Sequence, residues 1–300
     1  MPINIANGTK RCVFVLCFAL CAMLLAGCSR EVPPVEINVD AGAAMIAEAK
    51  NGKILFEKNP DRRFPPASTA KVMTAIVAIE RIPLTKDMVV SRRAVRVAPT
   101  VAGLRSGTEY QMRDLIDAIL IKSANDAAVV IAEGVAGSEK EFARLMNAMA
   151  KELGMENTYF ANATGLPAGK NDRQYTTAED LVKMMRYAMR YKVILKAMSK
   201  KEADIYGSDG RRIHLGTHNK ALLRDSEAPW GKTGYTKQAR RTFVGVDPSP
   251  DPHITFALLR SDDLWNDITT LNDRGLEIYR RNHRTLVSDL VRWIRSEREK

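Results

Sequence analysis

The sequence predicts an α+β domain in which segments near both chain ends form one antiparallel sheet around a large, mostly helical insertion. Strand-like segments lie at residues 43–59 and return at 240–247 and 253–260. The stretch from about 113 to 190 instead shows mainly the apolar spacing of helices. The 300 residues, 45% of them hydrophobic, suffice for the core of one large domain or two small ones.

Residues 1–27 have the pattern of a bacterial export signal. Lys10 and Arg11 precede a short apolar run that ends in Leu-Ala-Gly-Cys at residues 25–28. The run is too short and wrongly flanked for an ordinary membrane-spanning helix. Its last four residues resemble a lipobox, which implies cleavage before Cys28, lipidation of this cysteine and attachment to the membrane of the cell envelope. An uncleaved anchor or plain secretion stays open, and each of these outcomes exports the bulk of the protein.

Net charge and the positions of cysteine and histidine limit which binding partners and which metal sites the sequence can support. The formal net charge of +11 suits an anionic polymer, although a merely basic soluble surface explains it as well. Export argues against nucleic acid as that polymer. Cleavage would leave Cys28 as the only cysteine of the mature chain, so we expect neither a disulfide nor a cysteine metal site. His214 and His218 are four apart, but they flank Gly216 in a strand- or loop-like segment, and we expect no metal and no cofactor.

The first half of the chain is predicted to contain a tether, a hairpin and a buried helix. Residues 28–38 are polar and contain proline, which suits a tether ahead of a domain at 39–282. The strand-like arms of 43–59 flank Asn51-Gly52, the dipeptide that a two-residue type I′ turn prefers. The stretch 65–80 then reads as a loop followed by a helix that is apolar nearly all round.

The middle and the end of the chain are predicted to be rich in helix. Residues 112–137 keep helical spacing up to a glycine-rich stop, and 139–155 form an amphipathic helix that ends near Gly154. Turn-forming residues fill 157–174, and 175–190 begin with threonines and acids in capping positions. The basic amphipathic helix expected within 283–300 should pack on the domain rather than bind membrane.

Three short sequence motifs occur in an order and at a spacing that indicate a catalytic site. An S-x-x-K at 68–71 opens the buried helix, an S-x-N at 123–125 follows 55 residues later, and a K-T-G at 232–234 follows after another 109. Each motif is weak alone, because composition makes chance matches common. The K-T-G is expected just before a strand. Together, in this order, they match the trio of penicillin-binding proteins and class A β-lactamases.

The chain resembles the low-molecular-mass penicillin-binding proteins that act as serine-type D-alanyl-D-alanine carboxypeptidases. The resemblance extends to the blocks PPASTAKVMTA, KSANDAAVVIAEGVAGS, FARLMNAMAKELGMENTYFANATGL, YTTAEDL and GKTGYT, between about residues 41 and 260. It implies the DD-peptidase/β-lactamase-like fold. It also implies removal of the terminal D-alanine from peptidoglycan stem peptides through an acyl-serine intermediate, inhibition by β-lactams, and an exported protein on the periplasmic side of the envelope.

Acyl transfer needs a nucleophile, a base and a proton route to the leaving group. Ser68 is the candidate nucleophile, and Lys71, one turn later, can accept its proton if apolar walls and a second cation lower the pKa of the amine. From these residues alone, a helix-capping serine and a solvated lysine remain an alternative. The resemblance implies that Ser123 relays a proton to the departing amine.

The resemblance also implies the substrate-binding residues, which are Asn125, Lys232, Thr233, Gly234 and Tyr235. In relatives, the asparagine bonds the substrate amide, the lysine and threonine hold the terminal carboxylate, and the glycine admits substrate beside the strand. Backbone N–H groups of Ser68 and Tyr235 would form the oxyanion hole.

The chain departs from the family pattern after the K-T-G, where Arg240 and Arg241 stand in place of the usual small residue. We expect both arginines to face solvent, but they could narrow or recharge the cleft. Three other functions stay open: a DD-endopeptidase, a β-lactamase and a non-catalytic wall-binding lipoprotein. A β-lactamase would need a deacylating glutamate that we cannot assign, since Glu179 is expected to cap a helix.

Overall fold

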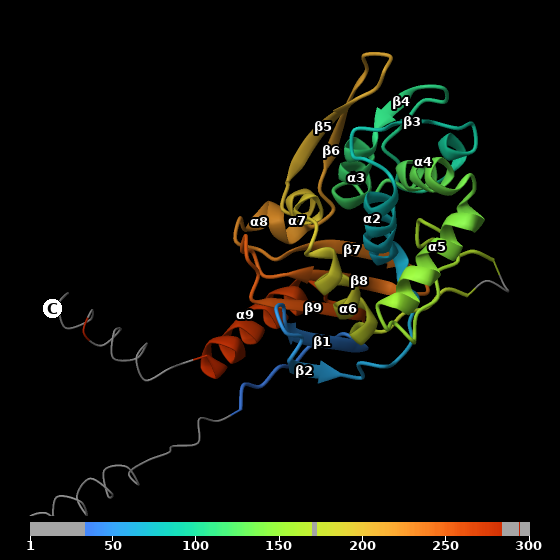
Figure 1. Ribbon diagram of the computed structural model, residues 1–300. Helices are drawn as coiled ribbons and strands as arrows, with labels where there is room; N and C mark the ends of the chain where they lie inside the picture. The colour runs from blue at the N-terminus through green and yellow to red at the C-terminus, as the bar shows by residue number, and fades with distance from the viewer. Residues whose placement is uncertain (1–33, 170–172, 284–293, 295–300) are drawn as a thin grey trace, which may run out of the picture. The chain divides into compact units, whose positions relative to one another are not determined.

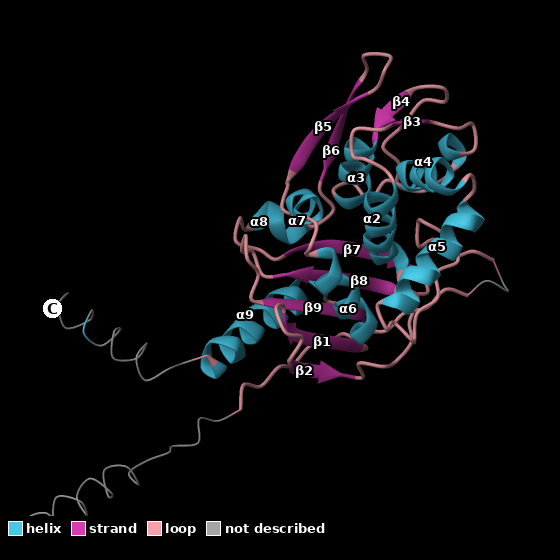
Figure 2. Cartoon of the chain, viewed as in Figure 1, coloured by secondary structure: helices cyan, strands magenta, loops and turns pink. Residues whose placement is uncertain are grey.

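Five antiparallel strands form the main sheet, in the spatial order β2-β1-β9-β8-β7 (Figure 1, Figure 2). The computed structural model describes residues 34–169 and 173–283 together with Ile294. The strands are β1 (Ala43–Glu48), β2 (Ile54–Lys58), β7 (Trp230–Thr236), β8 (Arg240–Val246) and β9 (Ile254–Ser261). Segments from both parts of the chain therefore build one sheet, and the predicted α+β architecture is confirmed.

Several predictions fall outside the described residues. They concern the export signal at 1–27, the lipidation of Cys28, most of the tether at 28–38 and nearly all of the terminal segment 283–300. Within the described part of the chain, no helix combines the length and the apolar character needed to cross a membrane.

Helices cover both faces of the sheet, which explains why its central strands read as almost continuous apolar runs. Along β1, Met45 belongs to the core shared with the helical insertion, whereas Ile46 belongs to a second core beneath α9 (Leu264–Asn282). Sequence reasoning assigned no helix to this segment. The signal was present, because the buried leucines and isoleucine of α9 recur at helical spacing on one face.

The predicted hairpin of β1 and β2 is confirmed, but its connection is not the two-residue turn expected from Asn51-Gly52. The Glu48 N–H donates to the Lys53 carbonyl over 2.8 Å, which leaves four residues in the loop. The cause is local. The Asn51 side chain donates to the Glu48 carboxylate over 2.8 Å, and Gly52 adopts a left-handed φ of +78°.

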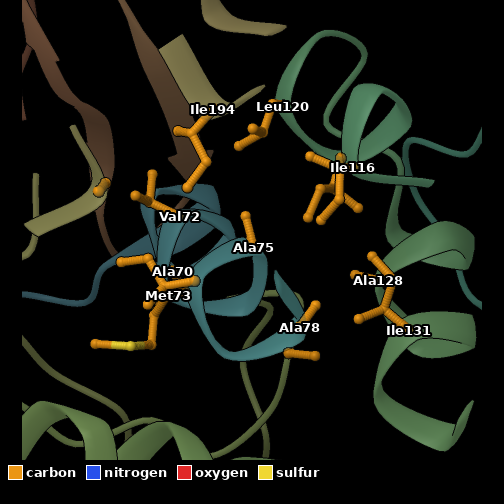
Figure 3. Close-up of a cluster of buried hydrophobic side chains, with 14 of the residues drawn as sticks. Ala70, Val72, Met73, Ala75, Ala78, Ile116, Leu120, Ala128, Ile131 and Ile194 are labelled. Atoms are coloured by element: carbon orange, nitrogen blue, oxygen red, sulfur yellow. The ribbon is translucent and has the colours of Figure 1, made fainter. Parts of the chain in front are cut away.

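The helical insertion is built around α2 (Ala70–Arg81), whose first nine residues are all buried. Figure 3 shows Val72 and Ala75 of this helix among side chains of its neighbours, including Leu120, Ile131 and Ile194. The neighbouring helices are α3 (Met112–Leu120), α4 (Asn125–Ala136), α5 (Glu139–Glu152), α6 (Ala178–Ala188) and α7 (Lys192–Met198). This packing fixes the start of α2 within the core.

Smaller elements complete the described domain. Two two-stranded sheets pair β3 (Asp87–Val89) with β4 (Glu109–Gln111) and β5 (Glu202–Tyr206) with β6 (Arg212–Gly216). The short helical segments are η1 (Ala67–Thr69), η2 (Ala94–Arg96) and α8 (Lys220–Arg224).

The helix α6 begins as the sequence predicts, with one difference at its cap. The Thr177 side chain accepts a hydrogen bond from the Asp180 N–H over 3.1 Å, which satisfies one of the free N–H groups of the first turn. Glu179, expected to take part in the cap, instead pairs with Lys183 at 2.9 Å.

The stretch 112–137, predicted to have helical spacing, forms two helices, with a break between α3 and α4. Ser123 lies in the break with a left-handed φ of +61°. Tertiary hydrogen bonds impose the break: the Asn125 N–H donates to Thr100, and Ile121 accepts from the His218 N–H. Both helices are buried, so their apolar spacing runs on across the interruption and conceals it in the sequence.

Candidate active site

The three sequence motifs meet where α2 begins beside β7 (Figure 1). Ser68 lies in η1, ahead of α2, and Asn125 is the first residue of α4. The K-T-G lies within β7 and not just before it, which corrects the sequence-based expectation. A Cβ atom added to Gly234 would stand 2.7 Å from the Ser68 nitrogen, so the strand runs directly against the nucleophile turn.

Ser68 occupies a turn that the surrounding loops hold in an unusual conformation. The preceding residue, Ala67, has a φ of +49°, a strained region for a residue with a side chain. The Pro66 carbonyl accepts hydrogen bonds from the hydroxyls of Thr69 at 2.7 Å and Thr242 at 3.2 Å. Gly165 packs so closely that an added Cβ would lie 1.8 Å from the Ala67 carbonyl oxygen. The turn is therefore fixed from both sides, while Ser68 itself is only half-buried.

Lys71 is fully buried one turn after Ser68, and its amine is surrounded by acceptors. The Nζ atom lies 2.9 Å from Ser68 Oγ, 2.7 Å from Asn125 Oδ1 and 2.6 Å from the Thr164 carbonyl oxygen. A neutral amine can donate two hydrogen bonds and accept one. With the amide and carbonyl oxygens as its acceptors, its lone pair is left for the Ser68 hydroxyl.

The surroundings of Lys71 favour this neutral form. Burial lowers the pKa of Lys71 well below its usual range, and the positive charge of Lys232 lowers it further. The carboxylates of Glu139 and Asp126 act in the opposite direction, with smaller effect. An amine that loses its proton readily can serve as a base toward a neighbouring hydroxyl.

Lys232 brings a second buried cation to the site. Its side chain is 1% exposed, and Nζ donates to the Thr233 carbonyl over 2.6 Å. Burial lowers the pKa of Lys232 to about 7. Thr233 is also buried, whereas Tyr235 is 63% exposed at the end of the motif. A protonated Lys232 would favour a carboxylate ligand beside β7.

The Ser123–Asn125 loop is anchored by hydrogen bonds on its far side. The Asn125 side-chain amide donates to the Pro99 carbonyl, which directs Oδ1 toward Lys71. Asp126 accepts from four backbone N–H groups, those of Ala102, Gly103, Leu104 and the adjacent Ala127. Ser123 is 4% exposed in this loop.

Sequence reasoning missed two features of the site. It assigned no role to Thr164 and Gly165, although both lie in a segment that resembles the family. The asparagine and glycine of this segment, ANATGL, do predict a tight turn. It also weighed His218 only as a metal ligand. Partial burial and the charges of Lys232 and Lys122 lower the pKa of His218 to about 4.

Arg240 and Arg241 are exposed, and both bond to Asp262. Arg240 Nε donates to the carboxylate over 2.7 Å, and Arg241 Nη1 donates to the main-chain oxygen over 3.0 Å. Among the residues that the structure describes, no group of three or more histidine, cysteine or acidic side chains is arranged to hold a metal ion.

Comparison with known proteins gives consistent matches. The family profile described as D-alanyl-D-alanine carboxypeptidase matches residues 29–251. A D-alanyl-D-alanine carboxypeptidase of Mycobacterium tuberculosis is 30% identical over 82% of this chain and 87% of its own length. The D-alanyl-D-alanine endopeptidase of Escherichia coli is 30% identical over 69% of this chain and 67% of its own. A carboxypeptidase of Bacillus subtilis is 32% identical, and there the match spans only 53% of the relative.

The fold also matches solved structures. A crystal structure of a D-alanyl-D-alanine carboxypeptidase from Mycobacterium tuberculosis superposes with a TM-score of 0.75 at 30% identity, covering 82% of this chain and 96% of the other. The family match at residues 29–251 includes all three motifs. The chain belongs to the D-alanyl-D-alanine carboxypeptidase family of serine peptidases.

Proposed function

We propose that this protein is a serine DD-carboxypeptidase that removes the terminal D-alanine from peptidoglycan stem peptides. The observation that carries the proposal is the buried Lys71 amine, which lies 2.9 Å from Ser68 Oγ and has two further acceptors. A lysine held in this way has no evident purpose in a wall-binding protein without catalysis, because burial of an ammonium is unfavourable.

In the proposed reaction, neutral Lys71 takes the hydroxyl proton as Ser68 Oγ attacks the carbonyl carbon of the penultimate D-alanine. The N–H groups of Ser68 and Tyr235 stabilise the resulting oxyanion. The C–N bond then breaks, and Ser123 passes a proton to the nitrogen of the leaving D-alanine. Water hydrolyses the acyl-Ser68 ester and restores the serine.

The remaining residues bind the substrate. A protonated Lys232 and the Thr233 hydroxyl hold the terminal carboxylate, and Asn125 bonds the substrate amide. Gly234 lets β7 pack directly against the nucleophile turn, since any side chain there would strike the Ser68 nitrogen, and so holds the substrate-binding strand beside Ser68. Penicillins, which mimic D-Ala-D-Ala, acylate the same serine.

A second candidate is a DD-endopeptidase, which would use the same residues on crosslinked strands. The Escherichia coli endopeptidase supports it, because its identity of 30% equals that of the Mycobacterium tuberculosis carboxypeptidase, although over less of the chain. Purified monomeric and crosslinked muropeptides distinguish the two candidates. Release of D-alanine from monomers supports the carboxypeptidase, and cleavage of the crosslink alone supports the endopeptidase.

We further propose that the domain is exported and anchored to the cell envelope through a lipid on Cys28, on the strength of the Leu-Ala-Gly-Cys sequence at 25–28. Mass spectrometry of the protein purified from membranes tests this proposal. An unmodified Cys28, or retention of residues 1–27, contradicts it.

Covalent labelling with fluorescent penicillin, followed by mass spectrometry of the labelled peptide, tests the catalytic assignment. We expect one adduct, on Ser68, and none in a folded Ser68→Ala variant. Labelling of that variant at the wild-type rate would refute the assignment. If the wild type gives no adduct, a nitrocefin assay shows whether turnover is too fast to trap, as in a β-lactamase, or whether the site is silent.

A further inference from the structure

Residues 161–169 form a loop that belongs to no helix or strand, yet this loop supplies one of the three acceptors of Lys71. Two side chains of α2 hold the loop from one side. Lys71 Nζ donates to the Thr164 carbonyl over 2.6 Å. The Thr74 hydroxyl, on the same helix, donates to the Ala163 carbonyl over 2.7 Å. Peptide groups outside regular structure are positioned by contacts of this kind. The place of the Thr164 carbonyl therefore depends on what else holds the loop.

Glu139, the first residue of α5, contacts the 161–169 loop from the side of that helix. Its Oε1 atom accepts a hydrogen bond from the Ala163 N–H over 3.3 Å, and its Oε2 atom accepts from Arg93 Nη2 over 2.6 Å. The Glu139 side chain is 15% exposed, whereas that of Arg93 is 56% exposed. Arg93 also pairs with Glu133 of α4 over 3.2 Å, so one guanidinium joins α4 and α5. The Glu139 carboxylate is thus held between a surface arginine and the loop that bonds Lys71.

Glu139 also acts on Lys71 through its charge. Burial, followed by the charge of Lys232, lowers the pKa of Lys71. The carboxylate of Glu139 raises that pKa, because an anion favours the protonated amine, and the carboxylate of Asp126 raises it less. Glu139 therefore has the largest effect in favour of the protonated form. The charged and titratable groups that face Lys71 from the surrounding elements are Lys232 of β7, Asp126 of α4, Glu139 of α5 and His218 of the loop before α8.

We propose that Glu139 is a positioning residue for the proposed base. With Arg93, it holds the Thr164 carbonyl against Lys71 and sets how readily the amine accepts the Ser68 proton. A hydrogen bond to a carboxylate is roughly twice as strong as one between neutral groups, so the charge of Glu139 also secures the loop. An acidic residue in the first turn of a helix can instead serve only the helix dipole, and the test below separates the two roles. This inference rests on the proposed function and names a group that governs its base.

The pH profile of acylation by benzylpenicillin tests this role. In the wild type, we expect the rate of acylation at Ser68 to rise with pH as Lys71 loses its proton. Glu139→Gln removes the charge but retains an oxygen that can accept from the Ala163 N–H. The pKa of Lys71 then falls, so the rising limb of the profile moves to lower pH. Glu139→Ala removes the hydrogen bond as well, and its maximum rate should fall by about threefold to tenfold.

Arg93→Gln should move the rising limb in the opposite direction. It leaves Glu139 without its cation, so the carboxylate favours the protonated form of Lys71 more strongly and the limb moves to higher pH. Glu141→Gln is the matched control on the same helix. The Glu141 side chain is 46% exposed and pairs with Arg144, so solvent screens its charge and the limb should stay in place.

The other titratable groups near Lys71 do not obscure this limb. His218 has a pKa of about 4 and stays neutral above pH 5, where the profile is recorded. Burial lowers the pKa of Lys232 to about 7, and loss of its proton lowers the rate at higher pH, because the carboxylate of the penicillin is then held less well. Since burial accounts for that pKa, the falling limb should stay in place in every variant and serves as an internal reference.

Three results would overturn the inference: a rising limb that Glu139→Gln leaves in place, an equal displacement in Glu141→Gln, or displacements of the same sign in Arg93→Gln and Glu139→Gln. General loosening of the fold would give the last result, because water admitted to the site moves both limbs to higher pH. Melting temperatures show which variants are folded, and Glu139→Gln, which keeps the size of the side chain, carries the test if Glu139→Ala is unfolded. A wild type that does not react with benzylpenicillin at any pH refutes the proposed function. A reactive wild type without a rising limb refutes the positioning role alone.

Discussion

Two pairs of basic side chains in the region of Ser68 differ in burial. Lys71 and Lys232 are 0% and 1% exposed, and burial lowers the pKa of both amines. Arg93 and Arg173 are instead exposed to solvent. A buried lysine can therefore exchange a proton during a reaction, whereas an exposed arginine offers a constant charge. The buried basic side chains are thus the lysines beside the proposed nucleophile, although burying a charged amine is unfavourable.

The largest expected effect comes from replacing a buried lysine. Lys71→Met keeps the volume of the side chain but removes the base, and we expect acylation by benzylpenicillin to slow by about 10²–10⁴-fold. Stopped-flow or gel-based labelling measures this rate, and circular dichroism confirms the fold. A fall of the acylation rate by less than about threefold would show that another group activates Ser68. The buried lysines would then not differ from the exposed arginines in taking part in proton transfer.

A smaller but substantial effect is expected from Gly165→Ala. The added Cβ would strike the Ala67 carbonyl and would also occupy a φ of +78°, so the nucleophile turn and the Thr164 carbonyl must shift. We expect acylation to fall by roughly tenfold or more, along with a lower melting temperature. Gly154→Ala is the control, because Gly154 has a φ of +67° with nothing within 4 Å of the added atom. Equal acylation rates in the two variants would contradict the role of the collision.

The pH dependence of stability tests the burial of Lys232. Its folded pKa of about 7 lies below the value of about 10.4 for a free lysine, so the folded state binds fewer protons between these values. Wild-type stability should then rise with pH across that window, and below pH 7 the buried charge is fully destabilising. Lys232→Met should melt higher than wild type at pH 6, by about 2–4 °C per kcal/mol relieved. This advantage should shrink toward pH 10.

The control for Lys232→Met is Arg173→Gln, whose melting temperature should follow the wild type at every pH. A difference in melting temperature between Lys232→Met and the wild type that stays constant from pH 6 to 10 would show that the charge of Lys232 does not destabilise the folded state. Calorimetry at matched ionic strength gives the comparison.

The smallest effect is expected where lysine replaces an exposed arginine. Arg93→Lys keeps the charge beside Glu139 but loses the paired donors of the guanidinium, so the maximum rate of acylation should fall by about twofold. The rising limb of its pH profile should stay closer to that of the wild type than the limb of Arg93→Gln. A displacement as large as that of Arg93→Gln would show that the paired donors of the guanidinium, and not its charge, moderate the effect of Glu139 on Lys71.

The sheet and the catalytic motifs could be read from the sequence because their signals are local. Apolar runs at both chain ends predict the strands, and S-x-x-K fixes the relation of Ser68 to Lys71 within one helical turn. The third acceptor of Lys71 could not be predicted. Thr164 contributes only a carbonyl, which carries no sequence signal, and it lies 93 residues from the lysine.

The break between α3 and α4 and the contact of Glu139 with the loop beside Lys71 were hidden for a related reason. The break is imposed by partners such as Thr100 and His218, which are distant from it in sequence. Glu139 lies 24 positions before Ala163, which belongs to a stretch that reads as an ordinary turn. Only the folded chain brings the two residues together beside Lys71.

The position of β7 at the edge of the sheet has a consequence for solubility. An unpaired edge strand invites pairing with another chain and hence aggregation. Here η1 packs against β7, and the Ser68 backbone meets Gly234 on that strand. This contact lies on the face of β7, because a side chain at Gly234 would point out of the sheet, so the unpaired edge of the strand stays open to extended peptides.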